Sequence, residues 1–287
     1  MFTYQSQGEK VTESMLKMFK RYEFDYNEWA QIKRKCDSEN ILFLSTPQNR
    51  SDLDLLLELK LSAIKVGSDD FTNLPLLEDY SATKLPMIVS CGMSDLSEVY
   101  QALDVIGTFD GYPTILLLCT SQYPTPPEDV NLLKLKTLEN TFPGLVLGFS
   151  DHTKGSLASS LAVGFGAVFF EKHFTLDNNL PGPDHWFSEN PEGLKDWVES
   201  IHKSYQIMGN ALVRPTLKEL EMRKLARRSI VILSDIKQGE ELTKENIGLR
   251  RAGDGLAPVL IKDILGSFAS QDLVKGNLLE LRKCSIK

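Results

Sequence analysis

Two histidines occupy matching positions at the ends of neighbouring apolar runs. His152 follows Gly148-Phe149-Ser150-Asp151, and His173 follows Phe170-Glu171-Lys172 one run later. If these runs are adjacent parallel strands of a barrel, the two imidazoles meet at the same mouth. Two imidazoles with neighbouring carboxylates suit a divalent transition ion that keeps open positions for substrate or water. A single histidine is more often an ordinary polar residue, but the matched pair favours a metal site.

A lysine and several hydroxyls also follow predicted strands. Lys65 lies near the end of the run at 63–66, Ser68 comes just beyond it, and Ser90 and Ser121 stand at comparable places on later runs. One cation among hydroxyls can hold a phosphate or a carboxylate. For each hydroxyl alone, the alternative is that it caps the following helix. An unpaired lysine in an apolar mouth would be unfavourable, so we expect an anion site near Lys65.

Two stiff loops carry further candidates. Tyr123 lies in Thr120-Ser121-Gln122-Tyr123-Pro124, where it either faces a substrate or packs against its neighbours. The loop Pro181-Gly182-Pro183-Asp184-His185-Trp186 brings an acid beside the predicted metal site, although its Pro and Gly are also ordinary loop residues. The pair Arg250-Arg251, far along the chain, is by default solvated.

The elements that must position these side chains alternate along the chain. Six short apolar runs predict strands, at residues 41–45, 63–66, 87–90, 115–119, 145–149 and 167–170. Segments with helical spacing lie at 50–61, 94–106, 131–142, 154–164 and 192–208. Continuous apolar strands that alternate with helices predict a parallel sheet, either covered by helices on both faces or closed into a barrel.

The positions of the polar clusters favour the barrel. A polar or ionisable group follows nearly every run, as at the mouth of a barrel, and no G-x-G-x-x-G opens a helix as in a doubly wound sheet. Residues before 41 read as a polar opening and one helix over 27–37, so only six of eight strands are counted. We therefore expect an α/β fold of the TIM-barrel (β/α)8 type that lacks the first two strands.

The pattern changes after residue 228. Short β-like runs such as Ile230-Val231-Ile232-Leu233 alternate with short helical pieces and glycine-containing turns. This texture predicts a small second domain of a compact β-clip kind. We expect a partial barrel over 1–210, a linker over 211–227 with a basic cluster at 223–228, and the small domain over 228–287.

Composition excludes several classes of protein. The chain has 287 residues and a formal net charge of −7, which argues against nucleic-acid or anionic-membrane partners. Its four cysteines form no CxxC pair, as expected for a reducing compartment. We find neither a membrane-spanning apolar stretch nor a signal-peptide pattern, so we expect a cytoplasmic protein.

Taken together, these motifs resemble the sialic acid synthase (N-acetylneuraminate synthase) family, whose members condense phosphoenolpyruvate with amino sugars. The resemblance covers nearly the whole chain in order, and its tail from about residue 228 resembles the family's antifreeze-like (SAF) domain. The motifs that carry it are Phe43-Leu44-Ser45-Thr46-Pro47, Lys65-Val66-Gly67-Ser68, Cys119-Thr120-Ser121-Gln122-Tyr123-Pro124, Phe149-Ser150-Asp151-His152-Thr153, Glu171-Lys172-His173-Phe174-Thr175 and Pro181-Gly182-Pro183-Asp184-His185.

The resemblance implies a TIM barrel joined to a SAF domain. The reaction it implies joins phosphoenolpyruvate to the open-chain aldehyde of an N-acylated amino sugar such as N-acetylmannosamine, with phosphate released by C–O cleavage. It also implies a homodimer, in which Arg251 of one SAF domain reaches the N-acyl group in the partner's barrel. The roles carried over are catalysis for Lys65, Tyr123, Glu171 and Asp184, substrate binding for Thr46, Ser68, Ser90, Ser121, Ser150 and Arg251, and Mn²⁺ binding for His152 and His173.

Family members begin with two further strands, which carry a substrate-contacting glutamate and a phosphate-contacting lysine. Their absence agrees with the count of six strands and leaves an alternative open, in which the chain is an inactive remnant that acts as a binding or partner subunit. A diacetamido sugar would instead make the enzyme a legionaminate or pseudaminate synthase. An octulosonate or heptulosonate synthase is disfavoured by the SAF-like tail and by Ser150-Asp151-His152-Thr153.

Overall fold

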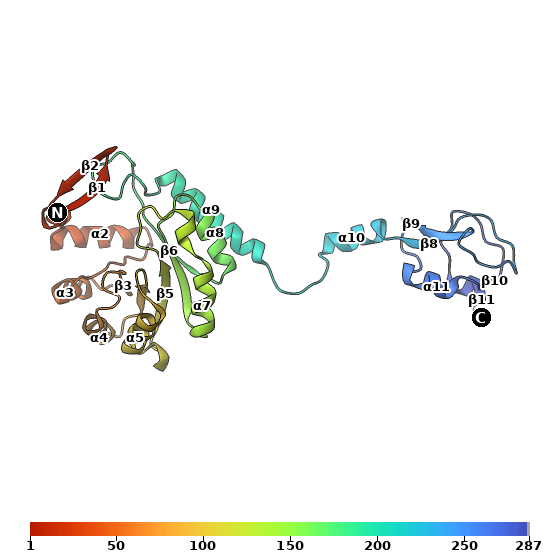
Figure 1. Ribbon diagram of the computed structural model, residues 1–287, viewed down its shortest axis with the longest axis horizontal. Coiled ribbons are helices and arrows are strands. Elements are labelled where there is room, and N and C mark those ends of the chain that lie inside the picture. The colour runs from red at the N-terminus through yellow and green to blue at the C-terminus, as the bar shows by residue number, and fades with distance from the viewer. Residues whose placement is uncertain (286–287) are drawn as a thin grey trace. The chain divides into compact units, whose positions relative to one another are not determined.

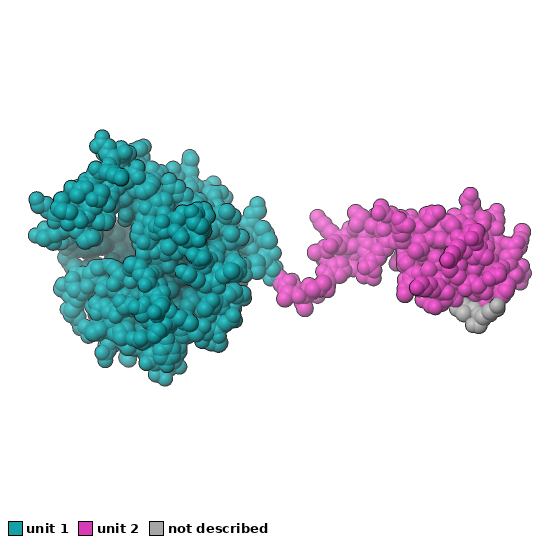
Figure 2. Space-filling view, in the orientation of Figure 1, with its two compact units in different colours: residues 1–209 teal, residues 210–287 magenta. Residues whose placement is uncertain are grey.

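The computed structural model describes residues 1–285, which divide into two compact units. The first comprises residues 1–209, and the second begins at residue 210 and is described as far as residue 285 (Figure 2). In the part of the chain that is described, no helix combines the length and the apolar character that crossing a membrane requires.

The first unit is built on a curled parallel sheet of five strands in sequential order (Figure 1). The strands are β3 (Ile64–Val66), β4 (Met87–Ser90), β5 (Thr114–Cys119), β6 (Val146–Asp151) and β7 (Phe169–Lys172). These confirm five of the six predicted strands, with shifts of up to two residues at their ends. Neighbouring strands pair in a register that places Ser150 beside Glu171 and Asp151 beside Lys172.

Helices connect the strands and cover the sheet. They are α3 (Arg50–Glu58), α4 (Leu74–Ser81), α5 (Leu96–Ile106), α6 (Pro127–Val130), α7 (Leu133–Thr141), α8 (Leu157–Gly164) and α9 (Pro191–Met208), with a short 3₁₀ turn at Thr108–Asp110. Helices α3, α5 and α9 begin at a side chain that caps the first backbone amides; at α5, Asp95 and Glu98 form a capping box. The strands and helices share one apolar core that includes Leu53, Leu77, Leu103, Leu116 and Leu135, all fully buried.

The predicted strand at 41–45 is wrong as a strand. This segment is extended but has no ladder, and its main-chain link to the sheet is a single bond from the Lys65 amide to the Ser45 carbonyl, 3.3 Å long. Pro47, two residues beyond Ser45, has no amide hydrogen that could continue the pairing. The segment is still partly buried: Leu44 packs against the small apolar cluster of Ala63, Ile88 and Leu117.

The N-terminal residues are more ordered than the sequence predicted. A hairpin of β1 (Phe2–Ser6) and β2 (Glu9–Glu13) is followed by α1 (Met15–Tyr22) and α2 (Tyr26–Ser38). Helix α2 confirms the helix predicted over 27–37, and Asp25 with Glu28 caps it. The hairpin turns at Gln7 and Gly8, which both have positive φ. Its two strands pair from Phe2–Glu13 to Ser6–Glu9, in a stretch that the sequence analysis described only as a polar opening.

The second unit has a small apolar core of its own. Its elements are α10 (Leu217–Ala226), β8 (Ser229–Ile232), β9 (Ile247–Arg250), a 3₁₀ turn at Pro258–Leu260, α11 (Ile261–Ile264), β10 (Phe268–Ala269), a 3₁₀ turn at Leu281–Lys283 and β11 (Cys284–Ser285). Strands β8 and β9 pair antiparallel, as do β10 and β11. Ile230, Leu242 and Ile264 are fully buried at the centre. Most of the segment expected as a linker, 211–227, is helix α10.

Candidate active site

A cavity of about 470 Å³ lies at the carboxyl ends of the strands in the first unit. Its lining contains nine of the residues that the sequence predicted for the site, and Cys119, Asp69, Gly67 and Met93 complete it. A larger groove of about 580 Å³ runs along α8 and α9, but apolar side chains dominate its walls. The nine predicted residues are Lys65, Ser68, Ser90, Ser121, Tyr123, Ser150, His152, Glu171 and His173.

Lys65 supplies the positive charge of this cavity. Its Nζ donates to Ser90 Oγ and to the carbonyl of Val66, both at 2.8 Å, and lies 3.5 Å from a carboxylate oxygen of Glu171. Glu171 in turn accepts a 2.6 Å hydrogen bond from Ser150. The side chain of Lys65 is only 12% exposed, so its charge is fixed in place and little screened by solvent.

The hydroxyls of Ser68 and Ser121 both lie close to the backbone of Gly92. A Cβ on this glycine would stand 2.6 Å from Ser68 Oγ and 2.6 Å from Ser121 Oγ, so only glycine allows both to approach. Ser68 Oγ accepts a hydrogen bond from the Gly92 amide. Ser121 Oγ is buried and has no hydrogen-bond partner among residues 1–285. Buried hydroxyls are normally bonded, so Ser121 is oriented for a partner that enters the cavity.

The two histidines lie side by side, with ring centroids 5.2 Å apart. His152 Nδ1 is 2.8 Å from the Thr120 carbonyl, which can only accept, so Nδ1 carries the proton and Nε2 keeps its lone pair. His173 Nδ1 lies 3.7 Å from a carboxylate oxygen of Asp184. The ring of Tyr123 is 4.3 Å from that of His152 and 5.5 Å from that of His173. Tyr123 therefore faces the site.

The surroundings shift the pKa values of these rings. Burial alone lowers the pKa of His152, but the adjacent Cys119 thiol and the Thr120 carbonyl outweigh it and raise the pKa overall. Burial lowers the pKa of His173, and Asp184 opposes this only in part, so His173 favours the neutral, ligand-competent form. Burial, reinforced by negative charge at Cys119 and Asp184, raises the pKa of Tyr123 to about 12, which keeps its phenol a proton donor.

The donor set fits a divalent ion held by two imidazoles. The Thr120 bond fixes the His152 tautomer in the way that ligating histidines are usually fixed. No cluster of three or more His, Cys, Asp or Glu side chains arranged for a metal occurs in the described part of the chain. With two imidazoles as its protein ligands, an ion here would keep coordination positions for water or substrate, as catalytic sites do.

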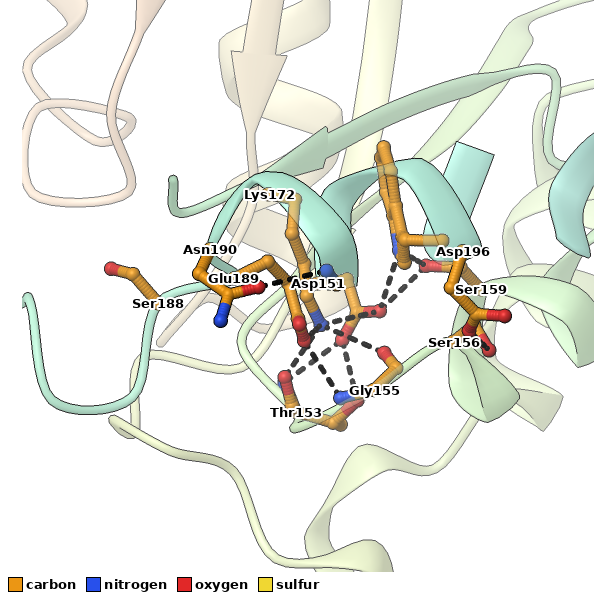
Figure 3. Close-up of polar contacts among 12 residues, drawn as sticks. Asp151, Thr153, Gly155, Ser156, Ser159, Lys172, Ser188, Glu189, Asn190 and Asp196 are labelled. Atoms are coloured by element: carbon orange, nitrogen blue, oxygen red, sulfur yellow. Dashed lines mark hydrogen bonds and ion pairs between the residues drawn. The ribbon is translucent and has the colours of Figure 1, made fainter. Parts of the chain in front are cut away.

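A buried polar network holds the strand ends that carry the histidines (Figure 3). Lys172 Nζ lies 3.1 Å from Asp151 Oδ2 and also donates to the carbonyls of Thr153 and Gly155. Asp151 accepts from the Thr153 amide and hydroxyl through one oxygen and from Ser159 through the other. Because Asp151 precedes His152 and Lys172 precedes His173, this network sets the backbone positions of both imidazoles.

Two helices and a loop join the same network. The indole of Trp197, on α9, donates to Ser159, on α8, at 2.9 Å and approaches Asp151 at 3.4 Å. Glu189, just before α9, accepts from the Gly155 amide and lies 3.7 Å from Lys172 Nζ. These contacts join strands β6 and β7 to helices α8 and α9 and to the loop before α9.

Two predicted residues of the first unit, Asp184 and Thr46, are not among the residues that line the cavity, and a third, Arg251, belongs to the second unit. Asp184 stands beside His173 but its side chain is 56% exposed. Thr46 lies half-buried on the extended segment before α3. Arg251 follows β9 in the second unit, where it is exposed.

Sequence reasoning missed the residues that support the site. Asp151 and Lys172 were both inside quoted motifs, and the available signal was strand alternation: if Ser150 and Glu171 face the cavity, their neighbours must face the helices. A charged pair on that buried side had to be mutually satisfied. Cys119 gave no such signal, since an apolar strand end is an ordinary place for cysteine.

Residues 1–212 match the model of the NeuB family, and residues 227–280 match that of the SAF domain. The chain belongs to the NeuB family. It is 39% identical over 280 residues to the N,N'-diacetyllegionaminic acid synthase of Legionella pneumophila, covering 96% of this chain and 78% of the relative. It is 37% identical over 246 residues to the pseudaminic acid synthase of Helicobacter pylori, covering 86% of this chain and 71% of the relative.

A solved structure is similar as well. The N-acetylneuraminic acid (sialic acid) synthetase of Leptospira borgpetersenii, determined in complex with citrate, matches with a TM-score of 0.67 and 33% sequence identity. The match covers 72% of this chain and 73% of that one.

Because the Ser121 hydroxyl has no partner, alanine substitutions at Ser121 and Ser150 should change the free energy of unfolding in opposite directions. Ser121→Ala should raise the free energy of unfolding by about 0.5–1 kcal/mol, because it removes a buried hydroxyl that lacks a partner. Ser150→Ala removes the same atoms but also the bond to Glu171, and should lower it by about 1 kcal/mol. Urea unfolding without ligand measures both. Equal destabilisation by the two substitutions would show that Ser121 is already bonded.

Proposed function

We propose that this protein is a nonulosonic acid synthase that condenses phosphoenolpyruvate with an N-acylated amino sugar and releases phosphate. The observation that carries the proposal is the strand-end cavity, which combines a nearly buried lysine, an unpartnered hydroxyl and two adjacent imidazoles. The names of its relatives, which are synthases of legionaminic, pseudaminic and N-acetylneuraminic acids, support the same reaction class.

Phosphoenolpyruvate would bind on the Lys65 side of the cavity. Lys65 and Ser90 offer a charge-assisted contact to its phosphate or carboxylate, and the Ser121 hydroxyl gains the partner it lacks. Ser68 and Ser150 lie on the same lining, and Thr46 remains a proposed contact from the preceding segment. Fixing both anionic groups orients the enol carbon toward the second substrate, which converts part of the barrier into binding.

The sugar aldehyde would lie on the histidine side. In the reaction, a C–C bond forms between the methylene carbon (C3) of phosphoenolpyruvate and the aldehyde carbon. Water adds to C2, and the bond between C2 and the phosphate oxygen breaks, which releases inorganic phosphate. Tyr123, protonated at neutral pH, can donate to the developing alkoxide, while Asp184 and Glu171 can accept protons from the attacking water.

A divalent ion, Mn²⁺ by our expectation, would be held by His152 and His173. When bound, it supplies Lewis-acid polarisation of the aldehyde carbonyl. The protein's own contribution is to hold the two rings in place: Thr120 fixes the tautomer of His152, and burial keeps His173 neutral.

We further propose that the curled sheet belongs to a barrel of the (β/α)8 type and that the active form is a homodimer. In that dimer, Arg251 would reach the N-acyl group of a sugar bound by the other subunit, a role supported by its match to the family's SAF arginine. N-acetylmannosamine is the first substrate to test. A diacetamido sugar is the second, because the relative with 39% identity is a diacetyllegionaminic acid synthase.

Phosphate release tests the reaction directly. Purified protein mixed with phosphoenolpyruvate, Mn²⁺ and N-acetylmannosamine, or a diacetamido sugar, should release inorganic phosphate only when a sugar is present. EDTA should abolish the release. A folded chain, verified by circular dichroism, that releases no phosphate with either sugar would contradict the proposal and favour a non-catalytic binding subunit.

Metal binding tests the two histidines separately. His152→Ala and His173→Ala should each weaken Mn²⁺ binding by about tenfold or more, the size of effect that loss of one ligand or of its support produces. Equilibrium dialysis measures this without turnover. His202→Ala, an exposed histidine on α9, is the matched control and should leave the affinity unchanged. Retained affinity in either ligand variant would remove that residue from the metal site.

A further inference from the structure

The N-terminal hairpin contacts the loop that carries Asp184. Ser6 Oγ accepts a 3.1 Å hydrogen bond from the Gly182 amide, and Gln7 Nε2 donates to the Asn179 carbonyl at 2.9 Å. Tyr22, at the end of α1, reaches the Pro181 carbonyl from the same side. Segments about 170 residues apart in sequence therefore lie side by side, as the hairpin and the loop before α9 do in Figure 1.

The contact with Gly182 is specific. Its neighbours Pro181 and Pro183 have no amide hydrogen, so Gly182 offers the single backbone donor of the three, and it gives that donor to Ser6. Ser6 is only 7% exposed, which protects the bond from water. Gly182 has φ +147°, a backbone conformation that favours glycine, and a Cβ there would also crowd His185 Cδ2 at 3.0 Å and Tyr22 OH at 3.2 Å.

Hydrogen bonds within residues 178–188 also hold the loop. Asn178 Nδ2 donates to the carbonyls of His185 and Ser188, both at 2.8 Å. Ser188 Oγ donates to the Asp184 carbonyl at 2.7 Å. Asp184 thus lies between anchors on both sides, and its carboxylate stands 3.7 Å from His173 Nδ1. The anchors that lie far away in sequence are the hairpin residues Ser6 and Gln7 and, at 3.5 Å, Tyr22 of α1.

We propose that Ser6 is a positioning residue: through its bond to Gly182, the hairpin fixes the Asp184 loop against His173 and so shapes the sugar side of the site. We call the Ser6–Gly182 bond, which holds the loop to the hairpin, the clamp. Its effect on sugar binding rests on the proposed function, whereas the clamp itself does not. Lys65 and Ser90, which would bind phosphoenolpyruvate, lie on β3 and β4 and make none of these contacts. Loss of the clamp should therefore affect the two substrates differently.

Ser6→Ala in the full chain tests the clamp by two measurements. Hydrogen–deuterium exchange of the segment 177–189 should become at least about fivefold faster, because the Gly182 amide loses its buried acceptor. The KM for the amino sugar should rise about five- to tenfold, as expected for loss of one buried hydrogen bond, while the KM for phosphoenolpyruvate stays within about twofold. Thr3→Ala is the matched control, since its hydroxyl pairs with Thr12 on the exposed face of the same hairpin.

Each outcome decides the question. Faster exchange in Ser6→Ala but not in Thr3→Ala, together with a selective rise in the sugar KM, supports the proposal. Unchanged exchange overturns the clamp, and faster exchange with equal changes in both KM values overturns its selective role. If the unaltered protein shows no turnover with any sugar, the proposed reaction fails, and exchange alone then decides whether the hairpin holds the loop.

Discussion

The ion pair between Asp151 and Lys172 is the constraint on which the site depends. The side chain of Asp151 is fully buried and that of Lys172 is 3% exposed, so neither charge can be solvated by water. Charges in such surroundings persist only when they are paired and their remaining hydrogen-bonding capacity is filled. Here the Thr153 and Gly155 carbonyls, Ser159 and Trp197 fill it. Satisfying these two charges fixes the carboxyl ends of β6 and β7.

Strand geometry converts this constraint into a site. Because side chains alternate across a sheet, the paired steps Ser150–Glu171 and Asp151–Lys172 face opposite sides. The first pair lines the cavity and continues through Glu171 to Lys65 and Ser90, while the second anchors the sheet to helices α8 and α9. The histidines follow immediately on both strands. The cavity with its lysine, unpartnered hydroxyl and two imidazoles is thus positioned by the Asp151–Lys172 pair, which itself faces away from the cavity.

The sequence predicted the parts of this arrangement that follow from local pattern. Apolar runs located β3 to β7, and polar residues at their ends located Lys65, Ser90 and both histidines, because every parallel strand delivers its last residues to one edge. The run at 41–45 has the same apolar composition but forms no strand, because an apolar run predicts burial and does not by itself predict hydrogen bonding to a neighbouring strand. The hairpin at 2–13 pairs locally and its alternation is a local signal, whereas the contact of Ser6 with Gly182 depends on a partner about 170 residues away that no local pattern encodes. Asp151 and Lys172 were visible as residues, but their pairing depends on the register between β6 and β7.

A double-mutant cycle on Asp151 and Lys172 tests the central claim most directly. Trp29, Trp186 and Trp197 all lie in the first unit, so tryptophan fluorescence during urea unfolding reports on that unit. Asp151→Asn and Lys172→Met should each reduce its free energy of unfolding by roughly 3 kcal/mol, since the first leaves Lys172 with only the longer contact to Glu189 and the second leaves Asp151 without a cation. The double variant should lose clearly less than the sum of the two, with a coupling of at least about 1.5 kcal/mol. Losses that add to within about 0.5 kcal/mol would contradict the claim that this pair holds the site together.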